Sequence, residues 1–416
     1  MCSLIALFRR ALPAVLLIVP LALAHAASAQ APQVGSTNGT SERAPVRIGV
    51  SGPFSGPSSP MGLSMRTGIR IATAELNAAG GVLGRRIELV ERDDEASNEL
   101  GAQIARDFVN RERVVAGLGI VNTGVALASQ RHYQNARIPV ITSVATGTLI
   151  TRQFQPPEFP QNYVFRVSAN DTLQAAVIAD EAVVRRGFTR LAILHDASNY
   201  GVLGSADLAA ALRGRGVEPV AVERFQLRQT DMQPQLERAR AAGAQAVLTY
   251  GIGPELAHIA NGMARMQWKV PIIGSWTLAM SNFIEIAGRN AEGARMPQTF
   301  IQAAHTPKQS AFLEAWQKAT GSTRIPVPPA AAQGYDSMLL LAAAIRQAGS
   351  VEGTRIREAL ENLQAPVDGV VMTYHRPFSA DNHETLHSTQ QIHLGEIRNG
   401  EVVFAREGEP PRNPLP

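Results

Sequence analysis

From residue 45 onward the chain alternates short apolar runs with longer amphipathic stretches. The run at 46–50 is short and mostly apolar, and it is followed by a stretch in which Met65, Ile69, Ala72 and Leu76 recur every three or four positions. Short apolar runs favour buried strands, and that spacing favours a helix with one apolar face. A repeated strand–helix order is typical of parallel sheets with helices on both faces. We therefore predict an α/β fold.

The same rhythm extends through most of the sequence in two successive cycles. Predicted strands span 46–50, 87–90, 114–118, 138–142, 163–167, 191–194, 220–225, 246–250 and 271–273, and a hairpin joins 390–398 to 401–405. Predicted helices, besides the one just described, span 98–111, 172–186, 201–213, 232–242, 254–266, 307–319, 330–347 and 354–362. The chain from residue 45 onward, about 370 residues, is long enough for two domains by usual domain sizes.

The stretch 114–148 carries the strongest indication of a binding site. Two neighbouring apolar runs end there in small polar residues, among them Asn122, Thr123 and Thr146. The carboxyl ends of adjacent parallel strands line the ligand crevice of an open α/β sheet. Helix N-termini at that edge offer unpaired N–H groups to an anion. The alternative is that these three residues only cap helices, which Asn, Ser and Thr favour in any protein.

The first 44 residues read as a targeting segment and a leader. Arg9 and Arg10 precede an apolar run, and Ala27-Ser-Ala29 fits a cleavage site, so residues 1–29 are predicted to be a signal peptide. Residues 30–44 are rich in Ser, Thr, Gly and Pro, and we predict a flexible leader. We accordingly expect a periplasmic protein without stable membrane insertion. The only cysteine is Cys2, so thiol chemistry is not expected of the processed chain.

Charge and motifs argue against several function classes. The formal charge is +4, or +2 without Arg9 and Arg10, and basic residues form no block, so nucleic acid is not an expected partner. No phosphate-binding Gly-rich loop occurs, and Gly117-Leu-Gly119 lacks the third glycine of a dinucleotide fingerprint. No nucleophile-elbow motif is present either. We predict no catalytic residues and no cofactor.

Two polar clusters contain residue types that occur in metal or acid–base sites. Four histidines lie near the end of the chain: His375, His383, His387 and His393. Their spacing alone is weak evidence for zinc, and their polar surroundings favour a structural or solvated role, so no metal site is predicted. The acidic run 93–95 follows a strand, where a turn or helix-entry charge is the usual role.

Several segments resemble the branched-chain amino acid binding proteins, which are periplasmic receptors of ABC importers with the type I periplasmic binding fold. The segments occur in that family's order: VRIGVSGPFSGP at 46–57, GIRIATAELNAAGG at 68–81, Asp93-Asp94, 138–146, HDASNYG at 195–201 and GYD at 334–336. The resemblance covers about residues 45–404.

The resemblance implies two doubly wound parallel-sheet lobes joined by three hinge strands, with the ligand held between the lobes. The first lobe would comprise 45–167 with 298–369, and the second 168–297 with 370–416. It also implies a monomer that binds a small molecule and delivers it to an ABC permease with its ATPase. Ligand-binding residues implied by the family pattern are Val121, Asn122, Thr123, Val144, Ala145, Thr146, Tyr200 and Tyr250.

Two positions depart from the family pattern. The amino acid receptors carry an acidic residue that pairs with the ligand ammonium, and the matching residue here is Trp276; an aromatic residue of the first loop is replaced by Met61. A buried ammonium without a carboxylate partner is costly. We therefore expect an organic acid with an apolar or aromatic body. If the ligand is an amino acid, its ammonium must reach another acid, and the candidates are Glu95, Glu255 and Glu285.

The sequence is also compatible with two other functions. A periplasmic ligand sensor on the same fold would hand its signal to a regulator instead of a permease. A secreted hydrolase on an α/β scaffold is a third possibility, because the fold alone does not determine function.

Overall fold

The computed structural model describes residues 44–406, so the predicted signal peptide and nearly all of the predicted leader lie outside the described residues. The first sheet has five parallel strands in the order β2-β1-β3-β4-β5. Their bounds are β1 (Val46–Gly52), β2 (Ile87–Asp93), β3 (Ala116–Gly119), β4 (Val140–Thr142) and β5 (Val164–Arg166). We call this sheet with its helices the first lobe.

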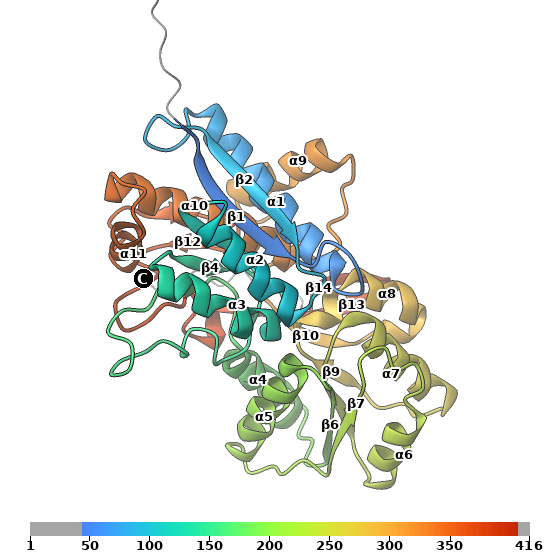
Figure 1. The fold of residues 1–416 in the computed structure, drawn as a ribbon. Coiled ribbons are helices and arrows are strands. Elements are labelled where there is room, and N and C mark those ends of the chain that lie inside the picture. The colour runs from blue at the N-terminus through green and yellow to red at the C-terminus, as the bar shows by residue number, and fades with distance from the viewer. Residues whose placement is uncertain (1–43, 407–416) are drawn as a thin grey trace, which may run out of the picture. The chain divides into compact units, whose positions relative to one another are not determined.

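Helices cover both faces of the first sheet because its strands are apolar on both sides. One face packs against α1 (Ser59–Ala78) and α10 (Pro328–Ala348), through a core that includes Ile48 and Val50. The other face packs against α2 (Asn98–Asn110) and α3 (Thr123–Ala136). The remaining helices of this lobe are α9 (Pro307–Thr320) and α11 (Gly353–Glu361). Figure 1 shows α1 and α10 on one side of the blue strands and α2 and α3 on the other.

The second sheet has seven strands in the order β14-β13-β10-β9-β8-β6-β7, and we call it with its helices the second lobe. The bounds are β6 (Leu191–Asp196), β7 (Ala221–Phe225), β8 (Ala246–Tyr250), β9 (Ile272–Gly274), β10 (Arg295–Gln298), β13 (His393–Arg398) and β14 (Glu401–Phe404). Strands β6 to β10 are parallel, and the last hairpin adds an antiparallel edge.

The second sheet is also covered on both faces. A core on one face joins the strands to α4 (Asp171–Ala179) and α5 (Asn199–Arg213). The opposite face packs against α6 (Gln233–Ala241) and α7 (Gly253–Arg265), with α8 (Ser281–Ala287) beside α7. Both sheets are therefore doubly wound, and the predicted α/β fold with parallel-strand sheets is confirmed.

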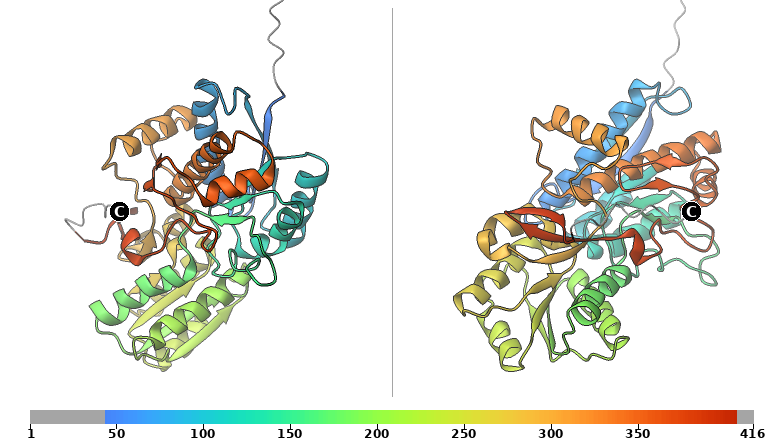
Figure 2. Two further views of the ribbon diagram at one scale, coloured as in Figure 1. Left: turned by 90° about the vertical axis from the view of Figure 1, so that its left-hand side faces the viewer. Right: turned by 180° about the vertical axis from the view of Figure 1, so that it is seen from behind.

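The chain passes between the two sheets three times. It leaves the first sheet after β5, returns after β10, and passes again in the segment 375–392 before β13. Figure 2 shows the red hairpin of β13 and β14 at the edge of the strands of the second lobe. A small hairpin of β11 (Val367–Asp368) and β12 (Thr373–Tyr374) precedes the third passage. The exact lobe boundaries stay a prediction.

The small hairpin is fixed to the first lobe by one buried carboxyl. Asp336 on α10 accepts hydrogen bonds from the backbone N–H groups of Val370 (2.6 Å) and Val371 (2.9 Å) and from the Tyr374 hydroxyl (2.8 Å). These contacts extend past residue 369, at which the sequence places the end of the first lobe. The hairpin stays with the first lobe because Asp336 accepts hydrogen bonds from backbone donors that would otherwise be buried without partners.

A few elements differ from the sequence-based predictions. The helix predicted over 172–186 is α-helical to Ala179 and continues as a π-helix over Asp180–Arg185. Strand β10 and helix α8 were not predicted. In β10 the sequence Arg-Met-Pro-Gln has neither an apolar run nor strict alternation, and its position between β9 and β13 comes from tertiary pairing. Among residues 44–406, no helix is long and apolar enough to cross a membrane.

Helices α1 and α10 approach each other closely at two glycines. A Cβ on Gly68 would lie 2.0 Å from the Ala331 carbonyl oxygen, and one on Gly334 would lie 2.4 Å from the Met65 carbonyl oxygen. Both neighbours are backbone atoms inside helices, so they cannot move aside without moving a helix. These glycines belong to the segments 68–81 and 334–336, so helix packing accounts for part of those motifs.

We predict that Gly68→Ala destabilises the protein by about 1–3 kcal/mol, the usual cost of overpacking a tight contact. Gly214→Ala is the matched control, because Gly214 has a right-handed helical conformation and an added Cβ would meet only ordinary contacts at 3.5 Å. Urea denaturation of the wild type and both variants measures the effect. Equal stability of the two variants would contradict the packing argument.

Candidate functional site

A cavity of about 520 Å³ lies where the strand ends of the two lobes face each other. The first lobe contributes the loop after β1, the loop before α2, the start of α3 and the loop after β4. The second lobe contributes the loop after β6, the start of α5 and the turn after β9. The residues that line it are Ser58, Met61, 95–99, 121–124, Thr146, 196–200, Leu227, Ile252, Trp276 and Thr277.

Most of the predicted binding residues lie in this lining. The structure brings together seven of them, which come from five separate segments of the chain: Met61, Val121, Asn122, Thr123, Thr146, Tyr200 and Trp276. That they contact a ligand stays a prediction. Their convergence follows from the parallel sheets, since the carboxyl ends of parallel strands meet at one edge.

Three predicted residues are not part of the lining. Val144 is fully buried in the core of the first lobe. The N–H of Ala145 donates to the Ile120 carbonyl (3.1 Å), so it has no free donor for an anion. Tyr250 lies behind Tyr200, with ring centroids 5.4 Å apart. In this structure these three residues therefore lie behind the lining, and that they contribute to ligand binding stays a prediction.

The turn between β3 and α3 is strained. Gly119 and Ile120 both have positive φ angles, 112° and 58°. For a β-branched residue such as Ile120 this is an outlier. Its N–H donates to the Ser51 carbonyl (2.8 Å), which holds the strained conformation. The turn directs Val121 and Asn122 into the cavity lining, in keeping with the tendency of such strain to occur at functional sites.

The capping alternative for Asn122 and Thr123 does not account for their side chains. Asn122 occupies the N-cap position of α3, but its side chain makes no capping hydrogen bond. Its amide nitrogen donates to the Ser58 hydroxyl (3.2 Å), and its Oδ1 is buried without a partner among the described residues. The Thr123 hydroxyl accepts from the N–H of Gly147 (3.3 Å), which joins the two loops of the first lobe.

The second lobe contributes two aromatic side chains with unsatisfied polar atoms. Trp276 begins a short 3₁₀ turn, Trp276–Ala279, and its backbone N–H donates to the Gln174 side chain (3.1 Å). Its indole N–H is buried and has no partner among the described residues. The Tyr200 hydroxyl lies near those of Ser275 and Thr277 but makes no hydrogen bond of acceptable geometry. Burial raises the pKa of Tyr200 well above its usual value.

One residue that the sequence analysis missed is Asp171. It is the first residue of α4, it is fully buried, and its Oδ2 has no partner among the described residues. Burial raises the pKa of Asp171 to about 7, although the hydroxyl of Thr146 and the charge of Arg166 act in the opposite direction. The sequence around it, Asn170-Asp171 before an amphipathic stretch, indicates only a helix start. The carboxyl therefore stands directly behind a predicted ligand-binding threonine.

Asp196, at the end of β6, is a second buried acid and lines the cavity itself. Burial raises the pKa of Asp196 to about 6, while hydrogen bonds from Ser198 lower it. The Ser198 hydroxyl donates to Asp196 (2.5 Å), but the other carboxylate oxygen of Asp196 has no partner within residues 44–406. This region of the cavity is thus able to change its charge near neutral pH.

The three acids considered as ammonium partners occupy different places. Glu95 lines the cavity and is exposed. Glu255 is buried and accepts from the N–H of Arg228 (2.6 Å). Glu285 is exposed and pairs with Arg324 (3.4 Å). Neither Glu255 nor Glu285 belongs to the lining.

The histidines near the end of the chain do not converge. His383 is bonded to the Val164 carbonyl (2.9 Å) and to Glu361 (3.1 Å), whereas His387 contacts the Asn382 side chain (2.9 Å). Within residues 44–406, no group of three or more His, Cys, Asp or Glu side chains is arranged to hold a metal ion.

Comparison with known proteins places this geometry in context. The chain is 26% identical to the Leu/Ile/Val-binding protein homolog 3 of Brucella melitensis over 310 residues, which are 74% of this chain and 81% of the relative. It is 26% identical to a leucine-, isoleucine-, valine-, threonine- and alanine-binding protein of Pseudomonas aeruginosa over 318 residues, 76% of this chain and 82% of the relative.

Solved structures share the fold. A leucine-binding protein from Thermotoga maritima superposes with a TM-score of 0.76 at 25% identity, covering 87% of this chain and 98% of its own. A solute-binding protein of an ABC transporter from R. palustris, solved with benzoate, gives a TM-score of 0.75 at 20% identity, covering 87% and 95%. At that identity the second similarity concerns the fold alone.

The family assignment rests on a match to a family model. Residues 45–401 match the periplasmic binding protein family, which is more than four-fifths of the chain. Proteins of this family are solute-binding receptors, not enzymes, and they bind small molecules for ABC transporters. The chain therefore belongs to the periplasmic binding protein family.

Proposed function

We propose that this protein is the receptor of an ABC importer for a small carboxylate-bearing solute, which it binds in the cavity between its two lobes. The observation that carries the proposal is a set of three polar atoms in residues that line the cavity. Asn122 Oδ1, the Tyr200 hydroxyl and the Trp276 indole N–H are all buried without partners among the described residues. Buried polar groups are almost always paired. A ligand that pairs with them would remove three desolvation penalties at once.

The anion-binding pole would be in the first lobe. The hydroxyls of Thr123 and Thr146 lie at the start of α3 and beside the start of α4, where helix N-termini favour negative charge. The second lobe contributes Trp276 and Tyr200, and α1 of the first lobe contributes Met61. These side chains suit an apolar or aromatic body. We therefore favour an organic acid of this type. Two solved structures of similar fold contain benzoate and 4-hydroxybenzoate, and two others contain leucine and isoleucine.

Asp171 supplies a specific reason to keep an amino acid as the second candidate. When ionised, its carboxylate stands behind Thr146 and would attract an ammonium group while repelling a carboxylate. When protonated, it carries no charge and no longer repels a carboxylate ligand. The protonation state of Asp171 thus separates the two ligand classes.

We predict that affinity for 4-hydroxybenzoate falls between pH 6 and pH 8, by about tenfold. Asp171 is mostly protonated below its pKa of about 7 and becomes an unfavourable anion above it. Affinity for leucine would show the opposite trend, because the ammonium gains a partner. Titration calorimetry at several pH values measures both. In Asp171→Asn the trend should weaken to the part that Asp196 contributes. A rising affinity for the carboxylate with pH in the wild type would contradict the proposal.

We also predict that Thr123→Val and Thr146→Val each weaken carboxylate binding by about 1–3 kcal/mol, the usual contribution of a hydrogen bond to a charged group. Thr73→Val is the matched control, since Thr73 is buried in α1 and its hydroxyl only donates to the Ile69 carbonyl (2.7 Å). Dissociation constants from calorimetry, with thermal stability measured separately, test the prediction. Wild-type affinity in both cavity variants would assign these threonines a structural role.

A screen of carboxylates and amino acids by thermal shift tests the ligand class more broadly. A ligand at a hundredfold its dissociation constant adds roughly 2.7 kcal/mol of stability. We expect aromatic and aliphatic monocarboxylates to stabilise the protein more than leucine. Stronger stabilisation by leucine than by every acid would overturn the preferred ligand class but not the receptor role.

A further inference from the structure

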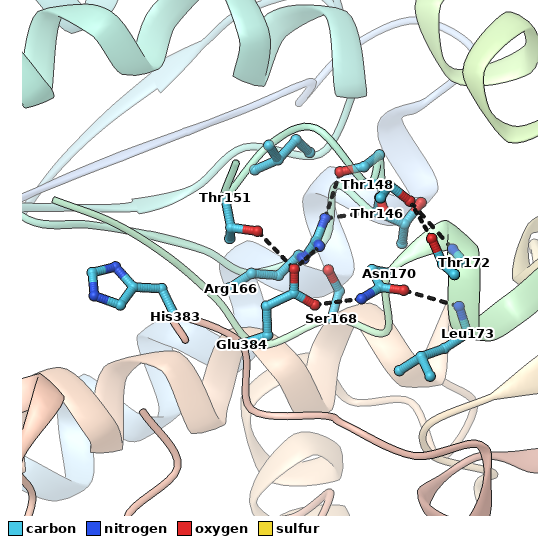
Figure 3. A network of polar contacts seen from close by, with 12 residues as sticks. Thr146, Thr148, Thr151, Arg166, Ser168, Asn170, Thr172, Leu173, His383 and Glu384 are labelled. Atoms are coloured by element: carbon cyan, nitrogen blue, oxygen red, sulfur yellow. Dashed lines mark hydrogen bonds and ion pairs between the residues drawn. The ribbon is translucent and has the colours of Figure 1, made fainter. Parts of the chain in front are cut away.

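Arg166, the last residue of β5, carries a guanidinium group that is entirely removed from solvent. Its Nη1 donates to the carbonyls of Thr146 (3.0 Å) and Gly147 (2.6 Å), and its Nη2 forms an ion pair with Glu384. Figure 3 shows the guanidinium between the Thr146 loop and Glu384. A buried charge needs an ionic partner and further hydrogen bonds, and Arg166 has both.

Glu384 comes from the third passage between the lobes, far from Arg166 in the sequence. Its carboxylate also accepts from the Thr151 hydroxyl (2.6 Å) and from the side-chain amide of Asn170, which in turn caps α4 at Leu173 (2.9 Å). Burial alone would raise the pKa of Glu384, but the Arg166 charge and these hydrogen bonds lower it below its usual value. Glu384 therefore remains ionised at neutral pH.

The backbones of the two segments are joined as well. The N–H of Arg166 donates to the His383 carbonyl (2.9 Å), and the N–H of Thr385 donates to the Arg166 carbonyl (3.1 Å). The first passage, which begins after β5, is thus hydrogen-bonded and ion-paired to the third. The first and third passages are therefore joined to each other next to the Thr146 loop.

Arg166 and the cavity contact different groups of the Thr146 loop. The carbonyls of Thr146 and Gly147 accept from the guanidinium. Thr146 also lines the cavity, and the Gly147 N–H donates to the Thr123 hydroxyl (3.3 Å). The loop has no regular hydrogen-bonding pattern of its own at these residues.

We propose that Arg166, paired with Glu384, is a positioning residue for ligand binding: it holds the Thr146 loop in its binding orientation and ties that loop to the third passage between the lobes. The inference rests on the proposed function only in that the cavity binds a solute. Arg166 itself does not line the cavity, so its effect on affinity acts through the loop.

The structure offers a matched control in Arg215. Its guanidinium also donates to two backbone carbonyls, those of Ala211 (2.7 Å) and Ala176 (3.1 Å), and pairs with Asp180 (2.7 Å). These contacts join α5 to α4 in the second lobe, and none of the residues lines the cavity. Arg215→Met therefore removes a similar set of bonds without touching the Thr146 loop.

The first experiment needs no ligand. Amide hydrogen exchange, followed by mass spectrometry, compares the wild type with Arg166→Met, Glu384→Gln and Arg215→Met. We expect faster exchange in residues 146–151 for Arg166→Met and Glu384→Gln, and unchanged exchange there for Arg215→Met. Wild-type exchange of residues 146–151 in both Arg166→Met and Glu384→Gln would overturn the proposal. Glu384→Gln keeps the side-chain shape and serves if Arg166→Met does not fold.

The second experiment measures binding of 4-hydroxybenzoate and of leucine by calorimetry. For whichever probe the wild type binds, we expect Arg166→Met to raise the dissociation constant by about tenfold or more, and Arg215→Met by less than about twofold. The double variant Arg166→Met/Glu384→Gln should lose less than the product of the single losses, because each single variant leaves an unpaired buried group.

The two experiments separate the two claims. If the wild type binds neither probe nor any other carboxylate, the proposed function fails, while the exchange data still decide whether Arg166 holds the loop. If carboxylates bind and the Arg166 and Arg215 variants lose affinity equally, or not at all, the positioning role is wrong and the proposed function stands.

Discussion

The constraint on which this structure depends is the burial of a charged group between its lobes. Arg166 has no contact with solvent, and it joins the loop after β4 to the segment that returns the chain to the second lobe. Removing one partner of a buried pair costs about 3–5 kcal/mol, because the other charge is left uncompensated. Such a pair tolerates little displacement, so it fixes the relative position of three segments distant in sequence. The cavity lies on the other side of the loop that it holds.

The cavity itself combines unsatisfied polar atoms with acids of altered protonation. Asn122, Tyr200 and Trp276 each have a buried polar atom without a partner among the described residues. Burial raises the pKa of Asp196, in the lining, to about 6 and that of Asp171, behind Thr146, to about 7. Groups of this kind cost stability in the absence of a ligand. Their concentration at one place is the expected physical signature of a binding site, where the cost is offset when the ligand is bound.

Much of the fold was predictable because its strands and helices are locally regular. The parallel strands are short apolar runs, and the helix face of α1 is evident from the spacing of Met65, Ile69 and Leu76. Elements that depend on partners were not predictable. Strand β10 contains a proline and no apolar pattern, and its pairing with β9 and β13 is decided only in the folded chain.

The candidate site was predictable in the same uneven way. Residues at strand ends, such as Thr123 and Thr146, are identified by position and type, whereas Tyr250 differs from Tyr200 only by lying one layer deeper. Asp171 and Arg166 escaped notice because their importance comes from burial, and burial of a charged residue cannot be read from its neighbours in sequence. Trp276 at the position where the family resemblance implies an acid was visible in the sequence, whereas the burial of Asp171, on which we propose that its effect depends, was not.

The most direct test of a carboxylate receptor is to identify the small molecules released when the purified protein, isolated from its native compartment without added ligand, is denatured and analysed by mass spectrometry. The account predicts one organic monocarboxylate in near-stoichiometric amount, absent from a Thr123→Val/Thr146→Val preparation. Recovery of a sugar, a polyamine or another solute without a carboxylate in that amount would contradict it.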